Sequence, residues 1–172
     1  MMRGYIQVYT GSGKGKTTAA FGLALRAAGA GLKVYIGQFL KKGSYSELNS
    51  INKLKEFIKI EQFGAKHLIT EKIREEDKEL ARRGFERIKK IIFSGEYDVV
   101  ILDEVNIALY YKLLSEEELI EVIKKRPSHT EIVLTGRYAS SQIIKIADLV
   151  TEMKQIKHYF SKGVKARRGI EK

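Results

Sequence analysis

The sequence predicts a three-layer α/β domain whose central sheet is mostly parallel. Short apolar segments alternate along the chain with longer segments of helical periodicity, as in folds built from strand–helix–strand units. The run Val99–Leu102 is wholly apolar, which is typical of a strand buried on both faces. No repeat and no linker rich in Pro, Gly or Ser divides the 172 residues. We therefore expect residues 1–172 to form a single domain.

The first half of the chain is expected to hold three strands and three helices. The first helix is rich in small residues, and the third carries apolar residues at helical spacing and stops near Gly95. In chain order, the expected elements are a strand at Ile6 and Val8, a helix at Lys16–Ala30, a strand at Val34–Phe39, a helix at Ser46–Phe57, a strand at Ile58–Phe63 and a helix at Thr70–Phe93.

The second half continues the alternation of strands and helices. After the apolar run that ends at Leu102, Ser115 is expected to cap a helix, and Glu118 three residues later completes a capping box. The remaining expected elements are a strand at Ile132–Thr135, a helix at Ser140–Ala147 and a short strand at Leu149–Thr151.

The charge of the chain indicates a polyanionic partner. There are 32 Lys and Arg against 21 Asp and Glu, a formal net charge of +11. Residues 1–46 hold seven bases and no acid, and residues 153–172 hold seven bases against Glu171 alone. A basic balance of this kind is typical of proteins that bind nucleic acid or a phosphate-bearing small molecule.

Other functions are excluded or disfavoured by composition. The chain has no cysteine, so disulfides, Cys-ligated zinc, iron–sulfur clusters and thiol nucleophiles are excluded. No apolar run approaches 18 residues, and residues 1–10 are too short and polar for a signal peptide. We expect a cytoplasmic protein with no membrane partner.

The strongest local motif is a phosphate loop between the first strand and the first helix. It runs Thr10-Gly11-Ser12-Gly13-Lys14-Gly15-Lys16-Thr17-Thr18. Glycines in such a loop let backbone N–H groups surround phosphate oxygens, while the Lys offsets their charge and the Thr hydroxyl ligates Mg²⁺. The strict pattern has glycine where this chain has Thr10, so the loop is expected to be one residue tighter than usual.

Two acids, Asp103 and Glu104, follow the apolar run that ends at Leu102. At the carboxyl edge of a parallel sheet they would face the phosphate loop, where a carboxylate can hold Mg²⁺ together with Thr17. Either acid fits this role. The two motifs together predict a P-loop NTPase-like (RecA-like) domain that binds a nucleoside triphosphate with Mg²⁺ (or Mn²⁺).

These motifs leave the reaction open, since phosphate loops serve ATPases, kinases, GTPases and transferases. A GTPase is disfavoured because the Asn-Lys-x-Asp motif is absent. A nucleic-acid-stimulated ATPase remains an alternative, with Tyr159 and Phe160 in the basic C-terminal segment as stacking residues. A small-molecule kinase would need arginines on a lid, and Arg82 and Arg83 are the nearest pair.

Longer segments decide between these alternatives. The sequence resembles the P-loop-type ATP:corrinoid adenosyltransferases. The matching segments include Gly4–Gly22, Arg26–Gly29, Gln38-Phe39 with Lys41, Leu102–Glu104, Arg126-Pro127, Leu134–Arg137, Ala147–Met153, Lys157-His158, Gly163–Arg167 and Gly169–Glu171. The resemblance spans nearly the whole chain, and Thr10 in place of glycine is the family's own form of the loop.

The resemblance implies that reduced Co(I) of a corrinoid attacks C5′ of ATP and that triphosphate leaves, with ATP bound in reversed polarity relative to other P-loop enzymes. The implied catalytic residues are Lys16, Thr17 and Glu104, and Thr17 and Glu104 would hold the metal. The implied nucleotide-binding residues are Gly11, Ser12, Gly13, Lys14, Gly15, Lys16, Thr17, Thr18, Arg26 and Arg137. Arg26 is alternatively a C-terminal helix cap, and Arg137 an ordinary strand-end arginine or a contact to the corrinoid.

The resemblance also implies partners: ATP, the reduced corrinoid, a flavoprotein electron donor and a second copy of the chain as a homodimer, without nucleic acid. One departure concerns the corrinoid. The family carries an aromatic pair after the third strand that displaces cobalt's lower ligand, whereas this chain has no Trp and offers Phe63 or His67 there. His158 is interpreted as a surface residue rather than a cobalt ligand.

Overall fold

The computed structural model describes residues 3–65 and 73–171. Within these residues the chain forms one six-stranded sheet in the order β3-β2-β4-β5-β1-β6, and every neighbouring pair of strands is parallel. The strands are β1 (Ile6–Thr10), β2 (Val34–Phe39), β3 (Ile58–Phe63), β4 (Val99–Asp103), β5 (Glu131–Thr135) and β6 (Leu149–Glu152). The predicted α/β class and parallel sheet are confirmed.

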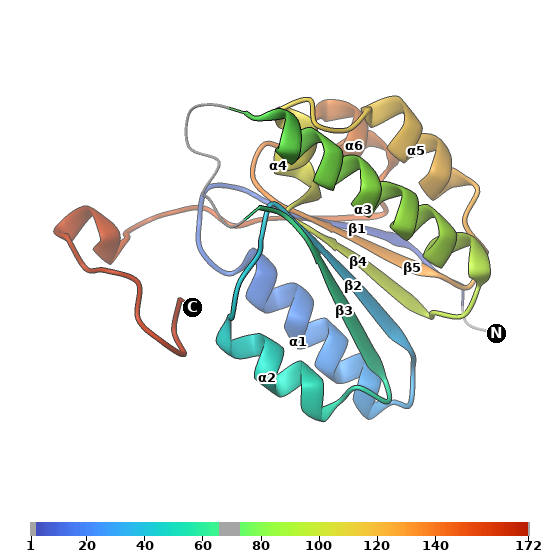
Figure 1. Ribbon diagram of the computed structural model, residues 1–172, viewed down its shortest axis with the longest axis horizontal. Coiled ribbons are helices and arrows are strands. Elements are labelled where there is room, and N and C mark those ends of the chain that lie inside the picture. Colours follow the sequence, from blue (N-terminus) through green and yellow to red (C-terminus); the bar gives the residue numbers. More distant parts are fainter. Residues whose placement is uncertain (1–2, 66–72, 172) are drawn as a thin grey trace.

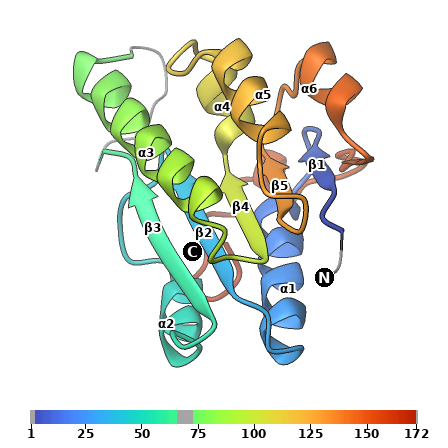
Figure 2. The ribbon, with the colours of Figure 1, turned by 90° about the vertical axis from the view of Figure 1, so that its right-hand side faces the viewer.

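Helices cover both faces of the sheet, which gives three layers (Figures 1 and 2). One face carries α1 (Lys16–Gly29) and α2 (Ser46–Lys53), and the other carries α3 (Glu75–Ser94), α4 (Val105–Tyr110), α5 (Glu116–Lys124) and α6 (Ser141–Ile146). Each side has its own apolar core: alanines of α1 pack under the first face, and Phe85, Ile88 and Ile92 of α3 pack under the second. Both faces of the central strands are therefore buried.

Some element boundaries differ from those expected. Helix α2 ends at Lys53 rather than Phe57, because Leu54 and Phe57 close a turn with backbone bonds to Ile51 and Leu54. Helix α3 begins at Glu75, and the expected start at Thr70 lies outside the described residues.

Two short elements were not expected from the sequence. Helix α4 follows β4 after a single residue, and a 3-10 turn, η1 (Tyr159–Lys162), lies in the segment after β6.

The parallel register places the ends of several strands at one edge of the sheet. β1 ends at Thr10, β2 at Phe39, β4 at Asp103 and β5 at Thr135, and the connections that follow them meet there. Open parallel sheets bind ligands at this carboxyl edge. The segment after β6 leaves the same edge and extends away from the body of the domain (Figure 1).

In the part of the chain that the structure describes, no helix combines the length and the apolar character needed to cross a bilayer.

Candidate functional site

The phosphate loop between β1 and α1 packs directly against the segment that follows β6. The backbone N–H of Gly13 donates to the carbonyl oxygen of Met153 at 2.6 Å. A Cβ on Gly13 would lie 2.7 Å from that same oxygen, so a side chain here would force the two segments apart. Gly15 has φ of 121°, a conformation that favours glycine, immediately before α1 begins. The loop glycines are therefore required by both contact and conformation.

Lys16 lies inside this loop. It is buried, and its ammonium donates to the carbonyl oxygens of Gly11 at 2.8 Å and Gly13 at 2.7 Å. Burial, with a contribution from Arg137, lowers the pKa of Lys16. The charge is thus held at the centre of the loop, where phosphate oxygens would be received.

Asp103, the last residue of β4, accepts hydrogen bonds from four side chains. Its Oδ1 accepts from the hydroxyls of Thr17 at 2.9 Å and Thr135 at 2.7 Å, and its Oδ2 accepts from Lys41 at 2.8 Å and Gln38 at 3.0 Å. The carboxylate is fully buried. Burial acts to raise the pKa of Asp103, but the Lys41 ammonium and the donated hydrogen bonds outweigh it, and the pKa lies below its ordinary value.

Glu104 differs from Asp103 in its surroundings. Its backbone adopts the left-handed conformation with φ of 62°, which is uncommon for a residue other than glycine, and its N–H donates to the Thr135 hydroxyl. Its Oε2 is buried, and within the described residues it has no hydrogen-bond partner. Burial, followed by the charge of Asp103, raises the pKa of Glu104. The sharp turn after β4 thus holds a second carboxylate beside the first.

Lys41 completes the group. The resemblance includes this residue but assigns it no role. Its ammonium lies 2.8 Å from Asp103 Oδ2, 3.2 Å from Thr17 Oγ1 and 3.9 Å from Glu104 Oε1. Burial opposes the positive charge, yet the two carboxylates outweigh it and raise the pKa of Lys41. A cation is therefore already present among the three groups that sequence reasoning associated with Mg²⁺.

The donor set fits Mg²⁺. One hydroxyl and two carboxylates are oxygen ligands of the kind that Mg²⁺ prefers, and no residue that the structure describes hydrogen-bonds the buried Oε2 of Glu104. Among residues 3–65 and 73–171, no three His, Cys, Asp or Glu side chains gather into a metal-binding group. Mg²⁺ is commonly bound by one or two carboxylates together with the phosphates of a substrate. A site with one hydroxyl and two carboxylates therefore suits a metal whose remaining ligands come from a triphosphate.

Of these groups, Thr17, Lys41 and Glu104 face a cavity of about 800 Å³ at the carboxyl edge of the sheet. It is lined by the loop from Ser12 to Thr18, by Lys41, Glu104 and Arg137, and by the start of α2. Of the residues predicted to bind nucleotide, Gly11 contributes through its bond to Lys16, whereas Arg26 does not line the cavity. Arg26 is exposed in the last turn of α1, in accord with the alternative role of helix cap.

The segment after β6 forms another wall of this cavity through His158 and Gly169–Glu171. It is tied to the phosphate loop by Lys14, whose ammonium donates to Glu171 at 2.8 Å, to the Tyr159 hydroxyl at 2.9 Å and to the carbonyl of Ile170 at 3.1 Å. The two basic ends of the chain therefore meet at one site, although they lie about as far apart in sequence as the chain allows.

His158 caps η1, because its Nδ1 accepts the N–H of Phe160 at 3.0 Å. Phe63, one of the two residues considered for the corrinoid, packs toward Phe39 with ring centroids 5.9 Å apart and lies over Gly84, where a Cβ would clash with its ring. His67, the other, lies outside the described residues.

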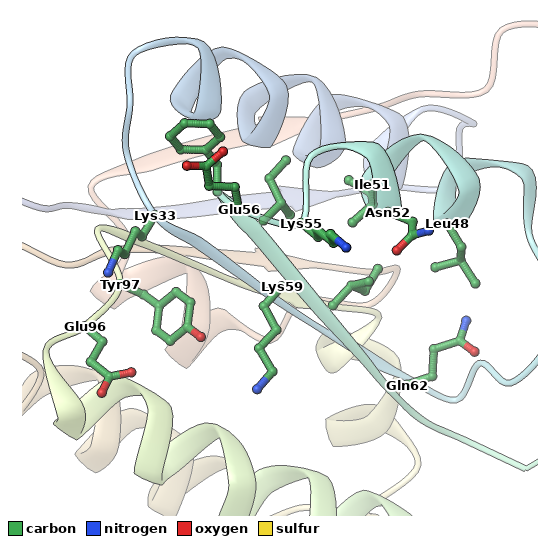
Figure 3. Close-up of a pocket in the computed structure, with 13 residues that line it drawn as sticks. Lys33, Leu48, Ile51, Asn52, Lys55, Glu56, Lys59, Gln62, Glu96 and Tyr97 are labelled. Atoms are coloured by element: carbon green, nitrogen blue, oxygen red, sulfur yellow. The ribbon is translucent and has the colours of Figure 1, made fainter.

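A second cavity, of about 630 Å³, lies between α2, the edge strand β3 and the segment before β4. Figure 3 shows the residues that line it, among them Lys33, Lys55, Lys59, Glu96 and Tyr97. None of the residues predicted to bind nucleotide or metal lines this cavity.

Comparisons with known proteins agree along the whole chain. A family model described as ATP:corrinoid adenosyltransferase BtuR/CobO/CobP matches residues 2–171. The chain is 37% identical over 171 residues to a corrinoid adenosyltransferase of Escherichia coli strain K12, covering 98% of this chain and 86% of that protein. It is 39% identical over 171 residues to the corrinoid adenosyltransferase CobA of Salmonella typhimurium, with the same coverage.

A solved structure of a KaiC-like protein from Pyrococcus horikoshii is similar in fold. The TM-score is 0.55 at 23% sequence identity, with 91% of this chain and 75% of that chain covered. This likeness concerns the fold alone, and it agrees with the predicted three-layer α/β fold with a parallel central sheet.

Proposed function

The chain belongs to the ATP:corrinoid adenosyltransferase family, whose members adenosylate corrinoids with ATP in cobalamin biosynthesis, and from this premise we propose that the cavity beside the phosphate loop is the active site. The observation that carries the proposal is that residues from separate elements of the fold meet at a single cavity. The loop from Ser12 to Thr18, the side chains of Lys41 and Arg137, and the carboxylate of Glu104 all line one cavity, and Asp103 lies buried behind them, bonded to Thr17 and Lys41.

The loop and its lysines act on the leaving group. In this reaction the C5′–O bond of ATP breaks, a Co–C bond forms with the electron pair of Co(I), and triphosphate departs with its negative charge. Lys16 and the loop N–H groups hold that charge, and Arg137, which lines the same cavity, adds a further positive charge. Fixed positive groups that match charge developing in the transition state lower the barrier. Lys14, which contacts the segment after β6, contributes a further positive charge to the same cavity.

A divalent metal would be held by the hydroxyl of Thr17 and the carboxylate of Glu104, with Asp103 beside them. When bound, Mg²⁺ neutralises charge on the triphosphate and orients it. Sequence reasoning pairs Thr17 with Glu104, and the hydrogen bond from Thr17 to Asp103 supports a role for Asp103 as well. Glu104, whose Oε2 has no hydrogen-bond partner in the described part of the chain, would supply a ligand, while Asp103 accepts the hydrogen bond of the Thr17 hydroxyl and orients it.

No side-chain nucleophile or general base is needed, because the cobalt of the reduced corrinoid is the nucleophile. The reducing electrons come from outside the chain, and we propose a flavoprotein donor. We further propose that the enzyme works in the cytoplasm as a homodimer.

The function is tested by incubating the protein with ATP, Mg²⁺ and a chemically reduced Co(I) corrinoid. Adenosylcorrinoid and free triphosphate are the expected products, and their ratio should be one to one. Formation of ADP and orthophosphate without a corrinoid product would contradict the proposal.

The site is tested separately by Lys16→Ala, which should abolish ATP binding in calorimetry because the charge at the centre of the loop is lost. Lys42→Ala is the matched control, since Lys42 is an exposed lysine that does not line the cavity. Equal ATP affinity in the two variants would show that the loop is not the triphosphate site.

A further inference from the structure

The ammonium of Lys41 lies among the groups that the proposed function assigns to the metal. It donates to Asp103 and to the Thr17 hydroxyl, and it faces Glu104. These groups come from three separate elements, namely the connection after β2, the start of α1 and the end of β4. The side chain of Lys41 is 19% exposed and its Asp103 partner is fully buried, so the pair is shielded from most of the solvent.

The backbone holds Lys41 in this position. Leu40, just before it, adopts the left-handed conformation with φ of 57°, which turns the chain sharply after β2. On the other side, Gly64 packs so closely that a Cβ there would lie 2.3 Å from the backbone nitrogen of Lys41. Both features restrict where the Lys41 side chain starts, and both are costly arrangements that a mere surface lysine would not need.

We propose that Lys41 is a resident cation that keeps divalent metal out of the site until a triphosphate arrives. The proposal rests on the metal site of the proposed function. In the nucleotide-free protein, Lys41 neutralises the buried carboxylate of Asp103 and occupies the space between it, Thr17 and Glu104. The metal then enters as a complex with the triphosphate, and Lys41 moves onto the phosphate oxygens.

Charge and size both support this exchange. An ammonium and a divalent cation repel each other strongly at contact distance in a buried setting. The ammonium already lies 2.8 Å from Asp103 Oδ2 and 3.2 Å from Thr17 Oγ1, so a Mg²⁺ ion approaching the Thr17 hydroxyl to its usual distance of about 2.0–2.1 Å would compete with Lys41 for this space. A triphosphate reverses the balance, because it adds enough negative charge for both cations to be bound. Lys41 lines the same cavity as the loop, so its ammonium can reach that charge without unfolding of the turn.

The exchange links metal binding to nucleotide binding. Without Lys41, two buried carboxylates would attract a free divalent ion, and the ion would fill the site before ATP. With Lys41, the free protein has little affinity for the metal, and affinity appears only together with the triphosphate. Linkage requires the reciprocal effect as well, so the metal should increase triphosphate affinity more in the wild type than in a protein without this lysine.

The test measures Mn²⁺ binding to the nucleotide-free protein by electron paramagnetic resonance, comparing the wild type with Lys41→Met. Mn²⁺ should bind Lys41→Met at least tenfold more tightly than the wild type. Lys42→Met, at the exposed neighbour, and Lys41→Arg, which keeps the positive charge, should both resemble the wild type. A second titration adds inorganic tripolyphosphate, with which the wild type should bind Mn²⁺.

The outcomes separate the inference from the proposed function. Equal Mn²⁺ affinity of Lys41→Met and the wild type, alongside Mn²⁺ binding with tripolyphosphate, overturns the inference alone. A wild type that binds no Mn²⁺ even with tripolyphosphate overturns the proposed metal site and the inference with it. If Lys41→Met is unfolded without metal, recovery of a melting transition when Mn²⁺ is added supports the inference, and no recovery overturns it. Mn²⁺ should leave the melting transition of the control Lys42→Met unchanged.

Discussion

Replacing Asp103 by asparagine removes one negative charge from the interior while keeping the shape of the side chain. The amide can place its NH₂ toward the hydroxyls of Thr17 and Thr135, which also accept hydrogen bonds, and its oxygen toward Lys41 and Gln38. The four contacts can then persist, three of them between neutral groups and the fourth from the Lys41 ammonium to a neutral amide oxygen. The loss is therefore the charge, which leaves the Lys41 ammonium partly buried without its nearest anion.

The size of this loss follows from the kind of contact. Removing one partner of a buried ion pair costs about 3–5 kcal/mol, and the preserved hydrogen bonds and the nearby Glu104 place Asp103→Asn at the lower end, about 3 kcal/mol. For a domain of this length, that corresponds to a fall in melting temperature of about 6–12 °C.

Urea denaturation and calorimetric melting of the metal-free protein measure this change. Glu96→Gln is the control, because it removes a carboxylate that is exposed and distant from the loop, and it should leave both transitions within error. A loss below about 1 kcal/mol for Asp103→Asn, in the range of exposed ion pairs, would refute the reasoning that Asp103 is the anion on which the buried cluster depends.

Three further changes probe other parts of the site. Gly13→Ala should weaken ATP binding more than tenfold in calorimetry, because the added Cβ would lie 2.7 Å from the Met153 carbonyl and displace the loop; unchanged affinity would contradict the packing. Glu171→Gln should make the segment after β6 more sensitive to limited proteolysis, because Lys14 loses its carboxylate partner, and wild-type resistance would argue against that tie. Glu104→Gln should raise the melting temperature of the metal-free protein at neutral pH. Burial and the neighbouring charge of Asp103 raise the pKa of Glu104 above its ordinary 4.5. The contribution of Glu104 to folding stability therefore falls as the pH rises from 4.5 through the raised pKa. Melting curves recorded across this pH range should show the fall in the wild type and lack it in Glu104→Gln.

Much of the fold could be predicted because its signals are local. The apolar run of β4 and the helical spacing of α3 are visible within a short window, and both elements are present, although the helix of α3 begins only at Glu75. Helix α4 was missed for the same reason. It is six residues long and begins directly after Glu104, so its sequence has too few turns to display a period, and tertiary packing of Val105 and Ala108 stabilises it.

The residues of the site fall into two groups, those within one continuous motif and those brought together from separate elements. The phosphate loop is a continuous motif, so its lysine and glycines could be named in advance. The partners of Asp103 could not, because Gln38, Lys41 and Thr135 come from different strands or the connections after them, and only the order β2-β4-β5 brings them together. The sequence likewise offers no signal that Lys14 contacts Glu171, which is 157 positions away.

The contact between Gly13 and Met153 has a consequence for the order in which the protein matures. The loop leaves the ribosome well before its backbone partner, which emerges some 140 residues later. Contacts between such distant positions form slowly, because a long stretch of chain must first be ordered. A nascent chain that stops before β6 lacks this partner, and it also lacks the strand that pairs with the second side of β1. The nucleotide site is therefore completed only after β6 and the residues that follow it have been synthesised, and chains truncated ahead of β6 should fail to bind ATP.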